Sequence, residues 1–254
     1  MDKILLSVEN LSVSVDKYEI LNNINLQINY GDFIFLKGPN GSGKTTFLDV
    51  LSCFNRDGKY VINGSIYFNG EYNILDSKYS ESYLKQKTYI EQVDPNLHIL
   101  GMSVLEIISL SIGNIPSYKT LSKNDIFNNI LSFFDKYKIN EFFPDKNMEK
   151  ILKSKAKHLS EGQKKIISLL SGLMRSQYTK ILIADEPLNH LDSSNIKKTI
   201  DLFTKFRSDF PELAIIITTH CHAFPEPTKY LLLKDKQINT SPVPYRYYDC
   251  FNYD

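Results

Sequence analysis

Residues 38–46 read Gly-Pro-Asn-Gly-Ser-Gly-Lys-Thr-Thr, and they are the most informative segment of the chain. It matches the pattern G-x-x-x-x-G-K-[ST], in which two spaced glycines are followed by a lysine and a hydroxyl residue. The apolar run at 33–36 reads as a buried strand, and residues 46–51 have helical spacing. A strand, a glycine loop and a helix in this order predict a phosphate-binding loop rather than an ordinary glycine turn.

The chemistry of this loop indicates a bound nucleoside triphosphate. Glycines let the backbone wrap closely around phosphates, so that successive N–H groups and the helix N-terminus face the negative charge. The Lys44 ammonium is expected to reach the β- and γ-phosphates, and the Thr45 hydroxyl to hold Mg²⁺. The residues expected to contact the nucleotide here are Gly38, Pro39, Asn40, Gly41, Ser42, Gly43, Lys44, Thr45 and Thr46.

Length and composition exclude several classes of protein. The 254 residues suffice for one large domain or two small ones, and 42% of them are apolar. The net charge of +1 gives no strong electrostatic attraction to nucleic acid. No apolar stretch approaches the ~18–20 residues of a membrane span, and the N-terminus lacks the layout of a secretory signal. We therefore expect a cytoplasmic protein, whose three widely spaced cysteines are free thiols rather than a disulfide framework.

The first part of the chain carries the pattern of β-strands. Residues 5–8, 11–15 and 19–28 alternate apolar and polar side chains, which predicts an antiparallel sheet with one face on a core. Residues 60–68 alternate again and are expected to return to that sheet. A further short strand is predicted at 88–91.

Farther along, the spacing of the apolar residues becomes helical. Residues from about 103 to 154 indicate a helical insertion, and a second helix-rich stretch follows at 160–175. Short apolar runs at 181–184 and 214–219, with a helix at about 195–206 between them, predict buried parallel strands. Strands that alternate with helices imply an α/β core with a mostly parallel sheet.

An acidic pair follows the apolar run at 181–184. A buried strand with an aspartate at its carboxyl end is the usual Mg²⁺-side partner of a phosphate loop, which assigns this role to Asp185. Glu186 would then face the γ-phosphate and orient or deprotonate water. Most Asp-Glu pairs are solvated, but this pair ends an apolar strand downstream of a phosphate loop.

Residues 159–163, Leu-Ser-Glu-Gly-Gln, precede a helical run. Ser160 is a good N-cap, and Gln163 three residues later completes a capping box, which is a sufficient structural explanation. The same geometry also makes an anion site, because the Ser160 hydroxyl and the Gly162 N–H lie at a helix N-terminus.

Taken together, these motifs resemble the ATP-binding cassette (ABC) ATPase family. The elements are the phosphate loop at 38–46, Gln92, the signature at 159–163, the acidic strand at 181–187, the segment 188–192 and His220. The resemblance spans most of the chain. It implies a single ABC domain over residues 1–254, of the α/β phosphate-loop NTPase class, with a mostly parallel core sheet and an N-terminal antiparallel β subdomain. A helical subdomain at roughly 93–178 is inserted in the RecA-like core.

The resemblance also implies the roles of individual residues. Glu186 is expected to be the general base, and His220 to contact the γ-phosphate and position the water. Gln92 is expected to touch Mg²⁺ or the attacking water, while Lys44 stabilises developing charge. The implied Mg²⁺ ligands are Thr45, Gln92 and Asp185.

A second cassette is implied as a partner. In this family the signature of one subunit closes over ATP held by the other, which assigns Ser160, Gly162 and Gln163 to the partner's nucleotide. Asp192 is expected at the contact between the two cassettes. ATP and Mg²⁺ are thus the implied cofactors, and no nucleic acid is expected.

The sequence departs from the family pattern at the adenine-stacking position, within the signature, and at Ile166, where a basic residue is often found three places after the signature glutamine. The aromatic residue that usually stacks on adenine is replaced by Val15, with Tyr18 three residues later. In the signature, Glu161 replaces a glycine, and Lys164 and Lys165 offset its charge. No catalytic group is removed, so slow hydrolysis is expected.

The resemblance favours the ATP-hydrolysing subunit of an ABC transporter, peripheral on the cytoplasmic face of the membrane and paired with a separate permease. Two alternatives stay open: a soluble non-transport ATPase similar to the iron–sulfur assembly ATPases, and a non-hydrolysing, ATP-dependent regulatory clamp. The transported substrate and the direction of transport do not follow from this chain.

Overall fold

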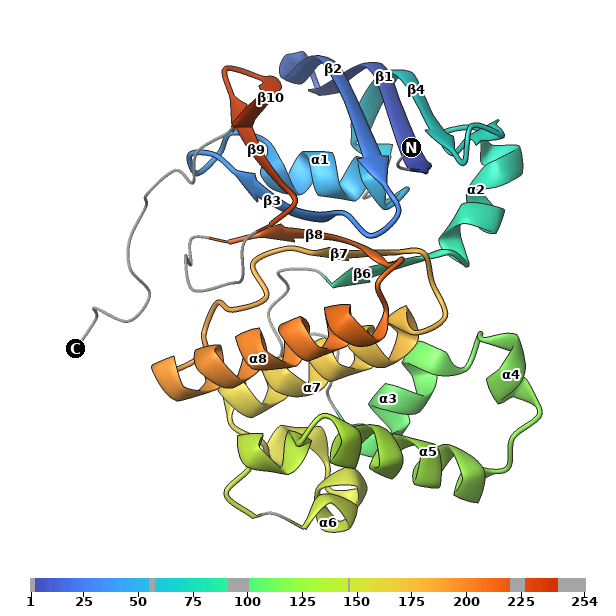
Figure 1. Cartoon of the computed structure of the whole chain (residues 1–254), viewed down its shortest axis with the longest axis vertical. Helices are drawn as coiled ribbons and strands as arrows, with labels where there is room; N and C mark the ends of the chain where they lie inside the picture. The colour runs from blue at the N-terminus through green and yellow to red at the C-terminus, as the bar shows by residue number, and fades with distance from the viewer. Residues whose placement is uncertain (1–2, 55–57, 91–100, 146, 220–226, 242–254) are drawn as a thin grey trace.

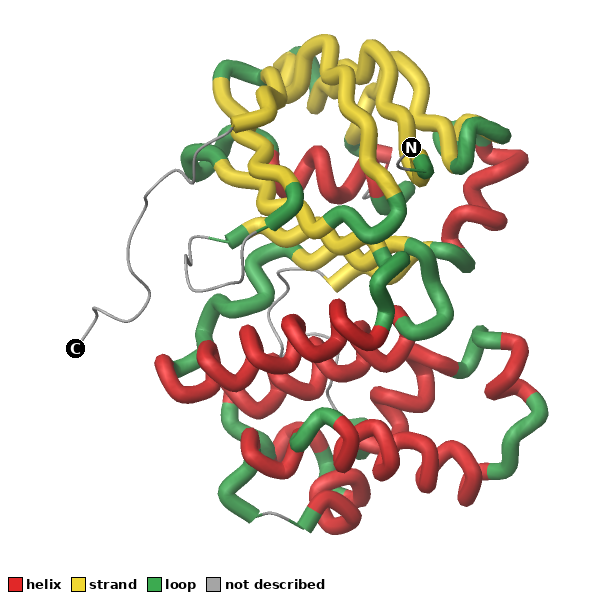
Figure 2. The backbone as a smooth tube through the Cα atoms, viewed as in Figure 1, coloured by secondary structure: helices red, strands yellow, loops and turns green. Residues whose placement is uncertain are grey.

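The computed structural model of the chain describes residues 3–54, 58–90, 101–145, 147–219 and 227–241. Two β-sheets occupy one half of the molecule, and most of the helices occupy the other half (Figure 2). Helix α1 (Lys44–Leu51) lies between the two sheets (Figure 1). The helix predicted to follow the phosphate loop is therefore enclosed by strands on both sides.

The smaller sheet is antiparallel and has the strand order β2-β1-β4-β5. Its strands are β1 (Ile4–Val15), β2 (Tyr18–Asn29), β4 (Tyr60–Phe68) and β5 (Tyr72–Asn73). The return of residues 60–68 to the N-terminal sheet is confirmed, because β4 pairs with β1.

One prediction for this sheet was wrong, since the structure has one strand where two were expected at 5–8 and 11–15. At the break, Asn10 has a φ of +50° and donates its N–H to Asn25 Oδ1 at 3.0 Å. On the neighbouring strand, a Cβ at Gly64 would lie 2.5 Å from the Asn10 carbonyl oxygen. This bulge interrupts the alternation of side chains without ending the strand.

The larger sheet has the order β10-β9-β3-β8-β7-β6, and all its strand pairs are parallel except β9–β10. The strands are β3 (Phe33–Lys37), β6 (Lys87–Ile90), β7 (Ile181–Ala184), β8 (Ala214–Thr218), β9 (Lys229–Lys234) and β10 (Gln237–Ser241). The strands β3, β7 and β8 are buried along their whole length, as their continuous apolar runs predict.

Strand β3 divides the core into two clusters. Ile34 and Leu36 face the cluster that fills the space between the sheets around α1. Phe33 and Phe35 point to the other face, into the cluster shared with the helices. The period of two residues in a strand thus places both clusters beside the segment that leads into the phosphate loop.

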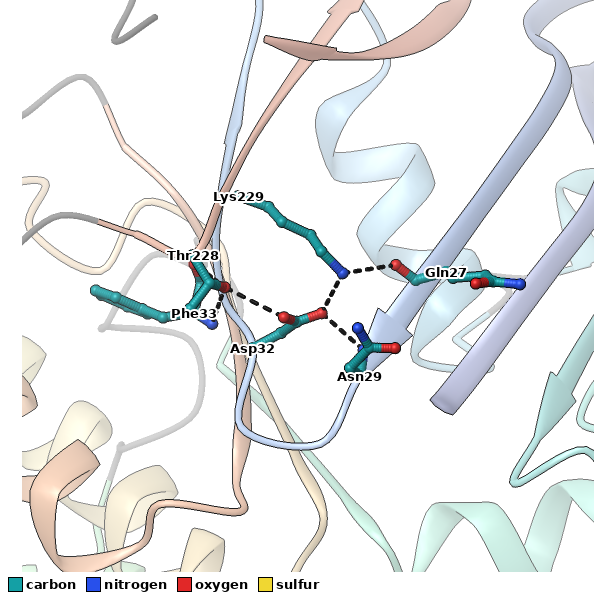
Figure 3. Close-up of polar contacts among 6 residues, drawn as sticks. All are labelled: Gln27, Asn29, Asp32, Phe33, Thr228 and Lys229. Carbon is teal, nitrogen blue, oxygen red and sulfur yellow. Dashed lines mark hydrogen bonds and ion pairs between the residues drawn. The ribbon is translucent and has the colours of Figure 1, made fainter. Parts of the chain in front are cut away.

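A buried polar cluster ties the beginning of β3 to β2 and β9 (Figure 3). The carboxylate of Asp32, whose side chain is 8% exposed, accepts hydrogen bonds from Lys229 Nζ at 2.6 Å, the Asn29 N–H at 2.7 Å and Thr228 Oγ1 at 3.2 Å. Lys229 Nζ also donates to the Gln27 carbonyl at 3.2 Å. This cluster fixes the two sheets to each other at the end of β3 opposite to the phosphate loop.

The helices that follow β6 form the second half of the molecule. They are α3 (Val104–Ile112), α4 (Pro116–Lys119), α5 (Lys123–Lys136), α6 (Met148–Lys153), α7 (Glu161–Ser176) and α8 (Ser193–Asp209), with short 3₁₀ turns η2 (Ile139–Phe142) and η3 (Ala156–His158). Helices α7 and α8 lie nearest the larger sheet, and α3, α5 and α6 lie beyond them (Figure 1). Within the described ranges, no helix is both long and apolar enough to cross a membrane.

Four elements were not predicted from the sequence: β5, α2 (Ser77–Leu84), β9 and β10. Helix α2 is capped by the Asp76 side chain and contributes the fully buried Tyr83. Strands β9 and β10 form a hairpin through Asp235 and Lys236, whose φ values are +50° and +65°. A two-residue turn with both φ values positive is typical of a tight hairpin. Such turns usually contain a glycine, and because this one has none, the sequence did not indicate it.

Candidate functional site

The loop between β3 and α1 follows a path that excludes larger side chains at two of its glycines. A Cβ at Gly38 would lie 2.3 Å from the Leu233 carbonyl oxygen. Gly43 has a φ of +102°, and a Cβ there would lie 2.8 Å from the Ile20 side chain. The loop is thus held between β9 and β2, and its shape is set by the surrounding backbone.

Helix α1 begins at Lys44 directly after this loop, and no side chain of the described residues caps its N-terminus. In contrast, α3, α5 and α7 each begin with a capping box. An uncapped first turn leaves N–H groups available to an anion.

A cavity of about 560 Å³ lies at this helix terminus. It brings together the loop, β2 and the end of β7, and its lining residues are Ile20, Asn40, Gly41, Gly43, Lys44, Thr45, Thr46, Asp185, Glu186 and Asn189. Phosphate-loop residues and the acidic pair, which are 140 positions apart in the sequence, therefore share one cavity.

The Lys44 side chain is folded back along the loop. Its Nζ donates to the carbonyl oxygens of Gly38 at 2.9 Å and Pro39 at 3.1 Å. Burial lowers the pKa of the Lys44 ammonium below its ordinary value, while the nearby charges of Glu186 and Asp185 act in the opposite direction. The ammonium thus lies against the loop, in the cavity that the acidic pair also lines.

Asp185 is the centre of a hydrogen-bond network at the end of β7. Thr45 Oγ1 donates to Asp185 Oδ2 at 2.7 Å, and Thr218 Oγ1 donates to Oδ1 at 2.5 Å. The Asp185 N–H in turn donates to the Ile90 carbonyl at 2.9 Å, which fixes its backbone to β6. A carboxylate beside a threonine hydroxyl offers the hard oxygen ligands that Mg²⁺ prefers, so these residues fit the ion.

Glu186 lines the same cavity in a strained backbone conformation. Its φ is +45°, and its N–H donates to Thr218 Oγ1 at 2.7 Å. The left-handed region is unfavourable for a glutamate and persists only where the surroundings enforce it. Thr218 enforces it here, since the one hydroxyl binds both Asp185 and Glu186.

Comparison with known proteins identifies the family. The sequence model described as ABC transporter matches residues 21–189, more than half of the chain. The chain belongs to the ABC transporter family. Its cassette is an ATPase domain of mixed α/β fold, as the sequence predicted.

Relatives of this ABC cassette carry a range of transporter names. A probable ABC transporter ATP-binding protein p29 of Mesomycoplasma hyorhinis is 30% identical over 92% of this chain and 89% of its own length. The lipoprotein-releasing system ATP-binding protein LolD of Buchnera aphidicola from Acyrthosiphon pisum is 28% identical, covering 87% of this chain and 90% of its own length.

Solved structures of ABC cassettes have the same fold. A dimeric cassette in a post-hydrolysis state, bound to ADP and phosphate, has a TM-score of 0.72 at 21% identity. The similarity covers 93% of this chain and 98% of that chain.

The signature of this ABC cassette lies outside the cavity of its own chain. Ser160 and Gln163 form the predicted capping box, with Gln163 N–H to Ser160 Oγ at 3.2 Å and Ser160 N–H to Gln163 Oε1 at 3.0 Å. Among the described residues that line the cavity, none is Ser160, Gly162 or Gln163. The structure thus places the phosphate loop and the signature of one chain at separate positions.

The remaining predicted residues divide into two groups. Gly38, Pro39 and Ser42 belong to the loop but do not line the cavity. Gln92 and His220 lie outside the described residues, so their roles stay predictions. Thr218, Asn189 and Ile20 were not singled out from the sequence. A threonine after three isoleucines in β8 was the one available signal, because a polar residue at the end of a buried parallel strand faces the ligand edge of the sheet.

Proposed function

We propose that this ABC cassette is the ATP-hydrolysing subunit of a transporter, which drives a separate membrane permease and works as a pair with a second cassette. The observation that supports this most is the convergence of Lys44, Thr45, Asp185 and Glu186 on one cavity of about 560 Å³. This is the arrangement that phosphoryl transfer from a triphosphate to water requires.

The phosphate loop and α1 would bind the triphosphate. The N–H groups of the loop and of the first turn of α1 provide hydrogen bonds along the β- and γ-phosphates. Lys44 would leave the carbonyl oxygens of Gly38 and Pro39 and turn its ammonium to the γ-phosphate. This exchange replaces two neutral acceptors by a charged one.

Thr45 and Asp185, with Gln92 as the predicted third ligand, would hold Mg²⁺. The ion would supply neutralisation of the charge that develops on the β- and γ-oxygens. Thr218 keeps Asp185 oriented through its second carboxylate oxygen.

Glu186 and His220 would act on the attacking water. Glu186 lies in the cavity with its backbone fixed by Thr218, as the general base of an in-line attack requires. His220 is two residues after Thr218, the last residue of β8, and its role rests on the sequence.

Tyr18 is the candidate platform for the base. Tyr18 and Val15 are cross-strand partners, so their side chains point to the same face of the sheet. Val13 and Leu21 belong to the buried core on this face, and Leu21 approaches Gly43 of the loop. The Tyr18 ring is 76% exposed and thus available to stack on a base.

The second cassette would complete the site. The uncapped α1 of one chain and the separately placed N-terminus of α7 are two anion-binding termini, which fit the two sides of one nucleotide only if two chains meet. The existence of dimeric cassette structures of the same fold supports this arrangement.

The permease is proposed from the names of the relatives. They include lipoprotein-releasing and zinc-import ATP-binding proteins, whose substrates differ. Peripheral binding at the cytoplasmic face of the membrane, with coupling through Gln92 and a helical subdomain at roughly 93–178, would follow from this role.

Phosphate release from ATP tests the enzymatic part of the proposal. Wild type should hydrolyse ATP, and Glu186→Gln should reduce the turnover by two or more orders of magnitude while keeping ATP affinity, because only the base is removed. Equal rates in the two proteins would refute hydrolysis and favour the regulatory clamp.

Recovery of the tagged chain from detergent-solubilised membranes tests the transport part. A multi-span membrane protein should co-purify in stoichiometric amount. Co-purification with soluble partners alone would reject transport and favour the soluble ATPase.

A further inference from the structure

Lys165 is a buried cation on α7 that none of the steps above uses. The residue is 4% exposed, in a row of otherwise apolar or small buried side chains on the same helix. Lysine is almost never this buried without a compensating charge, because removing an ammonium from water is costly.

The contacts of α7 show which way the helix runs across the sheet. Near its C-terminal end, Arg175 donates to the Leu84 carbonyl, just before β6 begins. Earlier in α7, a Cβ at Gly172 would lie 2.5 Å from the side chain of Ile90, the last residue of β6. Helix α7 is therefore antiparallel to β6, and its N-terminal half extends past the carboxyl end of that strand (Figure 1).

This direction carries Lys165 to the acidic end of the sheet. Lys165 is seven residues before Gly172, so it lies on the same face of the helix and roughly 10 Å nearer to its N-terminus. Ile90, at the carboxyl end of β6, pairs with Ala184, the last residue of β7, and Asp185 is the next residue of the chain. Gly162 is still closer to the start of the helix, and a Cβ added there would lie 3.8 Å from the His190 carbonyl oxygen. This short distance agrees with the alignment.

The electrostatics agree with this placement. Burial lowers the pKa of the Lys165 ammonium, and the charges of Asp185 and then Glu186 oppose that effect. The same two carboxylates act on Lys44 from the phosphate loop. Two cations, one on α1 and one on α7, thus interact with the acidic pair.

We propose that Lys165 is a positioning residue of the nucleotide site, which balances the charge of Asp185 and Glu186 while no metal is bound. The inference rests on the proposed nucleotide site. Without Lys165, the two carboxylates would repel the incoming triphosphate until Mg²⁺ neutralised them. With Lys165, the triphosphate can bind before the metal, and the helix that begins with the signature senses the charge of the site.

The test is a ratio of two affinities, measured by calorimetry with the ATP analogue AMP-PNP. The dissociation constant in EDTA is divided by the one in Mg²⁺, for wild type, Lys165→Met, Lys165→Gln and Lys165→Arg. Removal of the positive charge should raise this ratio about fivefold or more. Binding in EDTA is then weakened, whereas in Mg²⁺ the metal neutralises the two carboxylates in place of the ammonium. Lys165→Arg keeps the charge and should keep the wild-type ratio.

Arg175→Met is the matched control, because it removes a cation from the other end of the same helix. Its ratio should equal that of wild type. A purely structural role of Lys165 would weaken both affinities equally and leave the ratio unchanged, and an unchanged ratio in Lys165→Met and Lys165→Gln overturns the inference. A wild type that does not bind AMP-PNP in Mg²⁺ would overturn the proposed nucleotide site as well, so the two failures are distinguishable.

Discussion

Asp32 shows how burial decides the value of a single ion pair. Its carboxylate binds Lys229 at 2.6 Å, with side chains 8% and 26% exposed. Asp145 binds Lys150 at 2.8 Å in a similar pair, but these side chains are 50% and 73% exposed. Water competes for the second pair and hardly reaches the first, so the same contact has different effects.

Asp32→Ala should therefore lower the free energy of unfolding by about 3 kcal/mol, since it leaves the Asn29 N–H without its acceptor and the Lys229 ammonium without its charged partner. Urea unfolding followed by circular dichroism measures this loss. Asp145→Ala is the matched control and should leave the unfolding midpoint unchanged. Equal losses in the two variants would contradict the role assigned to the buried cluster.

Tyr18 can be examined by fluorescence, because the chain contains no tryptophan. Tyr18→Trp introduces a single fluorophore at the proposed base platform, and stacking of adenine on the indole should quench its emission. AMP-PNP should produce this quenching, whereas tripolyphosphate, which has no base, should not. Tyr178→Trp, at a tyrosine that is 43% exposed in the other half of the molecule, should respond to neither.

The affinity should follow the same rule. Tyr18→Ala should weaken AMP-PNP binding by about 1–3 kcal/mol, the usual range for a base stacked on an aromatic ring, and leave tripolyphosphate binding unchanged. An unchanged AMP-PNP affinity would show that the base lies elsewhere.

At the scale of elements, the sequence predicted best those segments that carry a strong local signal. The strand at 181–184 was predicted with its observed bounds, and the helix at 160–175 is α7 with Ser160 as its cap. Continuous apolar runs and capping boxes are local signals, so they can be read without knowledge of the fold.

The missed elements depend on tertiary contacts instead. Helix α2 is mostly polar and is held by the fully buried Tyr83, whose hydroxyl donates to the Leu51 carbonyl at 2.8 Å. In the site, the glycine loop and the acidic pair could be predicted from their sequence motifs. Thr218 was assigned no role, and Lys165 was expected to offset the charge of Glu161, because only packing decides which threonine or lysine points toward the carboxylates.

The packing of α7 on β6 makes a testable element-scale prediction. Gly172→Val should destabilise the protein by about 1–3 kcal/mol, because the added side chain overlaps Ile90 and pushes the helix from the sheet. Ile90→Ala makes room for it, so the double variant should be more stable than the sum of the single losses indicates. Strict additivity in urea unfolding would show that the two residues are not in contact.

At the scale of the whole molecule, the two sheets and the helical half would each supply a part of the proposed site. The smaller sheet presents Tyr18, the larger sheet the loop and the acidic pair, and α7 both Lys165 and the signature. Within a single chain the signature does not line the cavity, so the proposed composite site requires a second copy.

Sedimentation of the Glu186→Gln chain tests this requirement. In ATP and Mg²⁺ its mass should double from 29.3 kDa, because the nucleotide is bound but not hydrolysed. In ADP the chain should remain a monomer. Adding Ser160→Arg should prevent the doubling, since the arginine occupies the partner's nucleotide position. Adding Ser122→Arg instead, which removes the same kind of cap from α5, should not. A dimer that survives Ser160→Arg would contradict the composite site.

The most direct test of the account is a crystal structure of the Glu186→Gln chain with ATP and Mg²⁺. We predict the triphosphate along the N–H groups of the loop before α1, the ion between Thr45 and Asp185, and Ser160 of a second copy on the γ-phosphate. A nucleotide bound outside the cavity, or none at millimolar ATP, would contradict the account.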